Sequence, residues 1–352
     1  MGMSKITVNF RLAGENTVER NSRGVIFMIL RGNVPANNPL TITEEGEIPA
    51  SVSKDNTKYI KMALKGAVTA PKKVIAYFIG LEAEIDGALS YAATHYIDWL
   101  CMPSAQTDGL NEEIKEWVIA QKEFGNEVRA VLANTQADNA YIVNFVTDSV
   151  ITADGTFTAE QFTPRIAGII AGTPLSRSVT HTVIEEATDC TRLTREQMNT
   201  LVDEGKMFVF FDGEKVKLSR GVNSLQTLTA DKNAQFKKIK QTEAMIKIKS
   251  DLKKLGEDEY IGKFANTYSN RCILLTAIGE YLEGCVSDGL ISSHEESFDV
   301  LAIKNAMNTA KIDYTDMTDE EIIAYDFGTE VFIKARIRML DAIEDITISI
   351  LI

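Results

Sequence analysis

The sequence of 352 residues carries a formal net charge of −13, with 45% hydrophobic and 25% charged residues. This length predicts two or three folded domains, and the acidic balance argues against nucleic acid as the main partner because phosphate binding depends on clustered cations. The chain contains no apolar run near the ~18 residues that span a bilayer and no leader pattern, so we expect synthesis in the cytoplasm and no membrane binding by the subunit itself.

The chain begins with a predicted half-buried strand, because apolar and polar residues alternate strictly. Residues 13–23 are polar and predict an extended linker, so residues 1–23 form an expected N-terminal arm. This strand has no hairpin neighbour, although its backbone groups need hydrogen-bond partners. The apolar positions are Ile6, Val8, Phe10 and Leu12.

Residues 24–81 predict a small β module. Two short apolar runs rich in β-branched and aromatic residues, 25–30 and 74–79, indicate strands. Between them lie segments rich in turn-forming residues at 33–39 and 53–56.

Residues 82–227 predict a central α/β domain. Residues 96–102, 127–133 and 141–146 resemble buried strands, and residues 111–124 have helical spacing between the first two. A strand, a helix and a strand at this spacing indicate a parallel βαβ unit. Further along, Thr194 to Gln197 predicts a capping box that opens a helix, and residues 207–218 predict a hairpin around an Asp-Gly turn.

Residues 228–352 predict a C-terminal α+β domain. Residues 236–243 alternate loosely and indicate a strand, whereas residues 245–255 and 267–287 have helical spacing. Residues 333–339 predict a strand with one basic face, formed by Lys334, Arg336 and Arg338. The predicted fold class is therefore a multidomain α+β and α/β protein.

The chain ends with a second strand predicted at the extreme terminus, in the arm 345–352. Its alternating positions are Ile346, Ile348, Ile350 and Ile352. Two strands at the two ends either close a sheet within one subunit or are exchanged between subunits by β-augmentation. The residues alone leave both alternatives open.

No catalytic, cofactor-binding or metal-binding residues are expected. The segment from Gly256 to Lys263 departs from a phosphate-binding loop, because its glycines are spaced wrongly and Phe264 replaces the magnesium-binding hydroxyl. His95, His181 and His294 are far apart, and the four cysteines fit neither a zinc site nor a disulfide framework.

Lysines cluster between residues 237 and 254 of this acidic chain. The cluster is consistent with a solvated helix face or with an electrostatic contact to an acidic partner. The basic face of residues 334–338 supports the second interpretation weakly.

The last third of the chain resembles the C-terminal domain of contractile-tail sheath proteins. The landmarks are Arg220 to Leu225 (RGVNSL), Tyr260 to Asn266 (YIGKFAN), Tyr281-Leu282 and Gly289 to Ile291. The layout of the whole chain is similar to the short sheaths of Gram-positive phages and phage-tail-like R-type bacteriocins.

The resemblance implies a non-enzymatic structural subunit with no cofactor. Family sheaths assemble as stacked hexameric rings around an inner tail tube, between baseplate and tail-terminator proteins, and contract to drive the tube through a cell envelope. Their C-terminal sheet is completed by terminal strands of neighbouring copies, which favours strand exchange here. Assembly would take place in the cytoplasm, before release as part of a phage or bacteriocin particle. The implied candidate tube contacts are Lys247, Lys249, Lys253, Lys254, Lys334, Arg336 and Arg338.

Two other classes of function remain open from the residues. One is a small-molecule enzyme with its site at the carboxyl ends of the α/β strands, near Pro103 and Asn134. The other is a monomeric binding module whose termini close one sheet internally.

Overall fold

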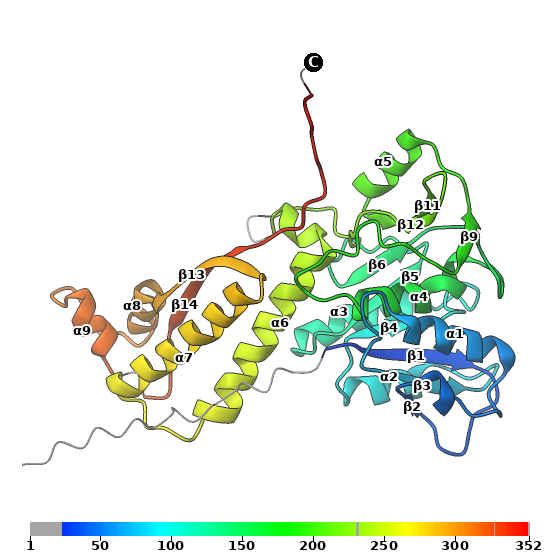
Figure 1. The fold of residues 1–352 in the computed structure, drawn as a ribbon. Helices are drawn as coiled ribbons and strands as arrows, with labels where there is room; N and C mark the ends of the chain where they lie inside the picture. Colours follow the sequence, from blue (N-terminus) through cyan, green and yellow to red (C-terminus); the bar gives the residue numbers. More distant parts are fainter. Residues whose placement is uncertain (1–22, 230–231, 327, 351–352) are drawn as a thin grey trace, which may run out of the picture. The chain divides into compact units, whose positions relative to one another are not determined.

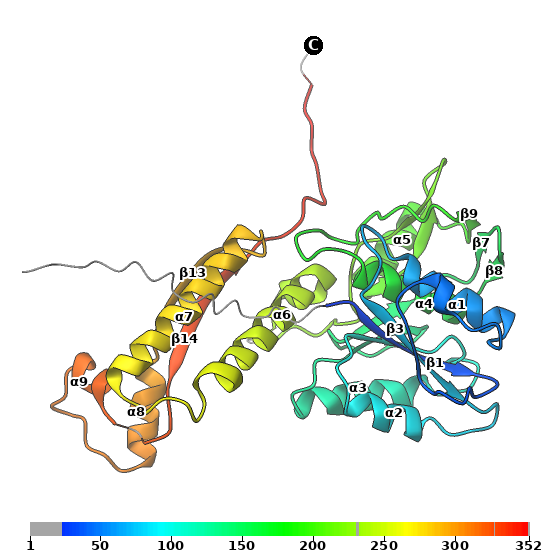
Figure 2. The ribbon, with the colours of Figure 1, turned by 60° about the horizontal axis from the view of Figure 1, so that its bottom comes forward.

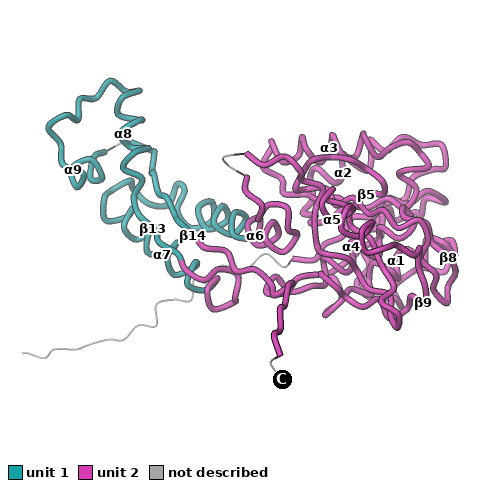
Figure 3. Tube along the Cα trace, turned by 90° about the horizontal axis from the view of Figure 1, so that it is seen from above, with its two compact units in different colours: residues 1–21, 248–284, 294–336 teal, residues 22–247, 285–293, 337–352 magenta. Residues whose placement is uncertain are grey.

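A computed structural model describes residues 23–229, 232–326 and 328–350. Two compact units share these residues (Figure 3). The core unit comprises the described residues up to 247 together with 285–293 and those from 337 onward. The small unit comprises residues 248–284 and the described part of 294–336.

A seven-stranded sheet in the order β10-β6-β5-β4-β1-β3-β2 forms the centre of the core unit. All neighbouring strands are parallel except β2, which runs antiparallel to β3 at one edge. The strands are β1 (Val25–Arg31), β2 (Leu40–Ile42), β3 (Lys73–Ile79), β4 (Trp99–Cys101), β5 (Arg129–Ala133), β6 (Ile142–Phe145) and β10 (Lys206–Met207).

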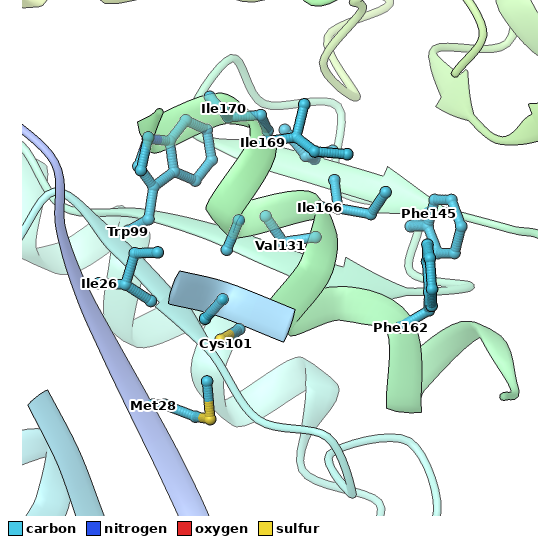
Figure 4. Packing of buried hydrophobic residues seen from close by; sticks show 14 of the residues in the cluster. Ile26, Met28, Trp99, Cys101, Val131, Phe145, Phe162, Ile166, Ile169 and Ile170 are labelled. Atoms are coloured by element: carbon cyan, nitrogen blue, oxygen red, sulfur yellow. The ribbon is translucent and has the colours of Figure 1, made fainter. Parts of the chain in front are cut away.

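Helices cover both faces of this sheet, which explains why its central strands are apolar on both sides. On one face, α1 (Lys54–Lys65) and α4 (Ala159–Ala171) pack on Met28, Trp99 and Val131 (Figures 2 and 4). On the other face, α2 (Asp86–Ala93) and α3 (Asn111–Glu123) pack on Phe27 and Leu100.

Smaller elements complete the core unit. A three-stranded sheet has the order β8-β7-β9, and β11 forms a hairpin with β12. Helix α5 follows β9, and α6 begins in this unit and continues into the small unit. The bounds are β7 (Val150–Thr152), β8 (Gly155–Phe157), β9 (Ala187–Cys190), α5 (Arg195–Asp203), β11 (Val209–Phe211), β12 (Val216–Leu218) and α6 (Ile239–Leu255).

Two antiparallel strands, β13 and β14, have residues in both units, and the small unit contains a helical pair with a core of its own. Backbone hydrogen bonds link Leu340 to Leu290 and Asp299 to Phe332, so β13 and β14 run in opposite directions. Helices α8 and α9 bury Ile303, Met307 and Ile322. The bounds are α7 (Tyr268–Ser287), β13 (Ile291–Phe298), α8 (Val300–Thr309), α9 (Asp319–Ala324) and β14 (Ile333–Met339).

The structure confirms the predicted βαβ unit, because β4 and β5 are parallel and α3 lies between them in the chain. It also confirms the capping box, in which Thr194 and Gln197 open α5, and the hairpin at residues 209–218. The helices at 245–255 and 267–287 and the strand at 333–339 are likewise present.

The prediction of a separate β module at residues 24–81 is wrong. Strand β1 pairs with both β3 and β4, so residues 24–81 and 82–227 build one sheet. The supposed turn at 53–56 contains Ser53, the N-cap of α1, whose side chain accepts a hydrogen bond from the amide of Asn56 at 3.2 Å. The core unit also extends to residue 247, beyond the expected boundary at 227/228.

The prediction of a strand at residues 236–243 is also wrong. This segment contains the end of a short 3-10 turn and the beginning of α6. Its loose alternation reflects Lys238 and Lys240, which contact a distant part of the chain. The N-terminal strand and residue 352 lie outside the described residues. None of the helices in the described ranges is both long and apolar enough to span a bilayer.

Candidate assembly interface

The first described residue, Arg23, fixes the root of the N-terminal arm in the core unit. Its guanidinium donates to Oε2 of Glu243 at 2.8 Å and to the carbonyl oxygen of Thr173 at 2.6 Å. The next two amides, of Gly24 and Val25, donate to Oδ2 of Asp98 at 2.8 and 2.9 Å. Residues 23–25, where the described chain begins, are therefore held on the core unit by side-chain contacts.

Arg129 joins this root to a buried charge cluster. Its side chain is 3% exposed, and its Nε lies 2.8 Å from Oε1 of Glu243 in an ion pair rather than an aligned hydrogen bond. It also pairs with Asp98 at 3.4 Å and lies over the ring of Trp99. Burial alone would lower the pKa of Arg129, but the carboxylates of Glu243 and Asp98 raise it above its ordinary value.

Two cations, Arg23 and Arg129, face two anions, Asp98 and Glu243, so the charges within this cluster balance. Such compensation is required because an unpaired buried charge is costly. The sequence analysis did not single out these residues. The available signal was a charged residue inside each of two apolar segments, around positions 98 and 129, whereas Glu243 lies among polar residues and gave no such signal.

The root of the C-terminal arm, residues 340–345, is held on the same unit. The carbonyl oxygen of Leu340 accepts hydrogen bonds from Lys240 Nζ and from Gln241 Nε2, the latter at 3.0 Å. Glu344 accepts from Ser178 Oγ at 3.1 Å and from Thr180 Oγ1 at 2.6 Å. Three ion pairs complete the root: Asp341 with Lys238, Glu344 with Lys238 at 3.5 Å, and Asp345 with Arg220.

Beyond this root, the C-terminal segment is extended and has no strand partner in the described chain (Figure 1). Ile346, Ile348 and Ile350 are 75%, 77% and 82% exposed. Single exposed apolar residues are common, but a row at alternating positions marks a surface that another chain can cover.

The sheet formed by β13 and β14 is the second incomplete feature. Within the described ranges neither strand has a further strand neighbour, so both outer edges offer unpaired backbone groups. A two-stranded sheet is marginally stable by itself. Lys334, Arg336 and Arg338 are exposed along β14, as the basic face predicts.

The lysines of α6 differ in their surroundings. Lys249 and Lys253 are exposed one helical turn apart, and Lys247 and Lys254 are half-buried. Lys253 lies 3.9 Å from Glu257. Lys240, by contrast, is buried, and burial lowers the pKa of its amine.

A pocket of about 920 Å³ lies at the carboxyl ends of β5 and β6, where the small-molecule alternative expects a site. Asn134 lines it, whereas Pro103 does not. Its two carboxylates, Glu112 and Asp148, belong to exposed residues. Cys101, whose thiol pKa is raised by burial, is not part of its lining. The pocket therefore contains neither of the features that would favour an enzyme, a buried carboxylate or a perturbed cysteine.

The three histidines stay apart. His95 stacks on Tyr91, His181 lies edge-on to Phe210, and His294 lies between Glu283 and Glu296. Across the described ranges, no group of three or more His, Cys, Asp or Glu residues is arranged to hold a metal ion.

Comparison with known proteins identifies the family to which this chain is similar. Residues 56–224 match the phage tail sheath protein central domain, and residues 231–352 match the phage tail sheath C-terminal domain. The tail sheath protein of Clostridium phage phiCD119 is 31% identical over 356 residues, which cover 99% of both chains. The chain belongs to the phage tail sheath protein family.

Solved structures show the same fold as this sheath-family chain. The sheath tail protein of Desulfitobacterium hafniense has a TM-score of 0.69 at 17% identity, over 84% of this chain and 93% of that one. The helical sheath of the anti-feeding prophage in its contracted state has a TM-score of 0.72 at 12% identity, over 100% and 99%.

The segment Arg220 to Leu225, one of the landmarks of the sequence, contacts the root of the C-terminal arm. Arg220 pairs with Asp345, the amide of Gly221 donates to Thr180 Oγ1 at 3.0 Å, and the Asn223 side chain donates to the carbonyl oxygen of Phe236 at 2.7 Å. The motif thus packs between the root of the C-terminal arm and the segment that opens α6.

Proposed function

We propose that this chain polymerises around an inner tail tube as the subunit of a contractile sheath, and that it acts without catalysis. The observation that carries the proposal is the pair of incomplete features: an exposed row of isoleucines and a two-stranded sheet with open edges. Backbone pairing between copies would satisfy both, and contraction would drive the tube through a target envelope.

In this proposal, residues 346–352 of one copy, and residues 6–12 of another, add strands to the sheet of β13 and β14. The two edges match the two arms in number. Copies joined in this way form rings and a continuous mesh that remains linked while the subunits move. The proposed further partners are baseplate and tail-terminator proteins, with assembly in the cytoplasm before release of the particle.

The experiment that tests the pairing replaces one isoleucine. Ile348→Asp places a charge on the apolar side of the arm, and we expect a folded monomer that forms no long sheath when coexpressed with the tube protein. Ser349→Asp is the matched control, since it adds the same charge on the other side of an alternating segment. The number and length of the sheaths are measured by electron microscopy. Long sheaths formed by the Ile348→Asp variant would contradict the proposed pairing.

Contact with the tube is proposed for two separate basic surfaces. One consists of the lysines on α6, of which Lys249 and Lys253 are exposed, and the other is the face of Lys334, Arg336 and Arg338 on β14. Both suit an acidic tube surface. Charge reversal at Lys249 and Lys253 is expected to reduce assembly of the sheath on the tube. Unchanged assembly would contradict the proposed contact between α6 and the tube.

A further inference from the structure

The root of the C-terminal arm has an inverted pattern of burial. Glu344 faces the protein and the isoleucines on either side of it face solvent, while Asp341 and Asp345, 41% and 81% exposed, form ion pairs with the protein at its surface. Glu344 is 8% exposed, whereas Ile343 and Ile346 are 86% and 75% exposed. Because apolar residues normally turn inward, this arrangement needs a specific set of contacts to hold it.

Those contacts come from three places in the core unit. Lys238, Lys240 and Gln241 lie at the start of α6, and Arg220 follows β12. Ser178 and Thr180 lie in the segment between α4 and β9. A root bound at three separate places has a fixed direction, which a single ion pair would not provide.

The electrostatics agree with this geometry. Burial alone would lower the pKa of Lys238, but Asp341 and Glu344 raise it above its ordinary value. The hydrogen bond with Asp345 raises the pKa of Arg220. Exposed ion pairs contribute little singly, so Glu344 is the central member, because it is buried and has several donors.

We propose that Asp341, Glu344 and Asp345 are positioning residues that clamp the root of the C-terminal arm and turn its isoleucines outward toward the next copy. This inference rests on the proposed function and adds to it the position in the chain at which the arm becomes free. The fixed root ends at Asp345, and residues 346–352 follow it as the free part of the arm. Seven extended residues span about 23 Å, at about 3.3 Å each, so the receiving sheet edge must begin within that distance.

The test measures two quantities: the mobility of a spin label in the monomer, and the yield of assembled sheath. A spin label is placed at Ile343→Cys, inside the root, or at Ile348→Cys, beyond it. Cys272 is replaced by Ser because it is the cysteine that is not buried. We expect an immobile label at position 343 and a mobile one at position 348. Equal mobility at both positions would overturn the clamp.

The variant that removes the clamp is D341N/E344Q/D345N, which keeps the shapes of the side chains. The label at position 343 should then become as mobile as the label at 348, and sheath yield with the tube should fall at least about tenfold. The matched control, E196Q/D203N/E214Q, neutralises three exposed carboxylates of the same unit and should change neither measurement. An immobile label at 343, or a normal sheath yield, in the clamp variant would refute the inference.

Failure of the proposed function would look different. The unsubstituted chain would then form no sheath with the tube, whatever the spin labels show. In that case the monomer labels alone would decide whether the root is clamped.

Discussion

At the scale of single residues, the charge cluster of Arg23, Arg129, Asp98 and Glu243 holds the first described residues on the core unit. Glu243 is the shared member, because it contacts both guanidinium groups. Removing one partner from a buried ion pair leaves an uncompensated charge, which destabilises a protein by about 3–5 kcal/mol.

Glu243→Gln should therefore lower the free energy of unfolding of the monomer by about 3 kcal/mol or more, measured by urea denaturation. Glu204→Gln is the control. It removes a carboxylate that is 50% exposed and paired with Lys206, and its cost should be about 1 kcal/mol at most. Equal effects of the two substitutions would show that the buried cluster does not stabilise the fold.

His294 predicts a pH dependence within the small unit. Hydrogen bonds to Glu296 and then to Glu283 raise the pKa of its imidazole above 6.5. A group with a raised pKa stabilises the folded state fully below its unfolded pKa, and this contribution is lost as pH rises through the folded pKa. Unfolding free energy should therefore fall as pH rises above about 6.5, through the raised pKa of His294. His294→Gln should remove that slope, and an unchanged slope would contradict this role.

At the scale of elements, α1 and α4 approach each other through glycines. A Cβ added at Gly168 would lie 2.3 Å from the carbonyl oxygen of Ala63 and 3.0 Å from its Cα. A Cβ added at Gly172 would lie 2.1 Å from the carbonyl oxygen of Thr69. Backbone atoms cannot give way as flexible side chains do, so Gly168 sets how closely α1 and α4 pack, and Gly172 sets how closely the loop after α1 lies against the end of α4.

Gly168→Ala should consequently destabilise the monomer by about 1–3 kcal/mol, despite the better helix propensity of alanine. Gly46→Ala is the control, because no atom lies within 4 Å of its added Cβ. Urea denaturation of both variants makes the comparison. A Gly168→Ala protein as stable as the control would mean that the helices can move apart freely.

Elements were predictable from sequence where the pattern is local. The capping box of α5, the turn between β11 and β12 and the period of α3 need no distant contact. The β-module error arose because the apolar runs of β1 and β3 do not reveal whether strands pair in parallel or antiparallel. The sequence does contain the helical pattern of α1, because Asn56, Ile60, Ala63 and Leu64 recur at helical spacing and form its buried face. The start of α6 was missed because Lys240 is buried by a contact with Leu340, 100 residues away.

At the scale of the whole molecule, the roots of both arms meet on the first turns of α6. Arg23 binds Glu243, and residues 340–345 bind Lys238, Lys240 and Gln241. Arg23 and residues 340–345 are therefore held by one short stretch of chain, residues 238–243. The alternating patterns predict strands at both ends of the chain, but they could not locate the contacts of residues 23 and 340–345, whose partners lie about a hundred residues or more away in the sequence.

Deletion of residues 346–352 tests whether this segment is needed for assembly but not for folding of the monomer. The described part of this segment is exposed, so the free energy of unfolding of the monomer should change by no more than about 0.5 kcal/mol. Sheath formation with the tube should be lost. A large loss of monomer stability would indicate that the segment pairs within its own chain, as in the monomeric binding module.

The most direct measurement is a high-resolution structure of the assembled sheath. The account predicts backbone hydrogen bonds between residues 346–350 of one copy and an outer edge of the sheet of β13 and β14 in another. Residues 340–345 should keep their contacts with Lys238 and Arg220 of their own copy. A sheath in which residues 346–350 pair with their own subunit would contradict the account.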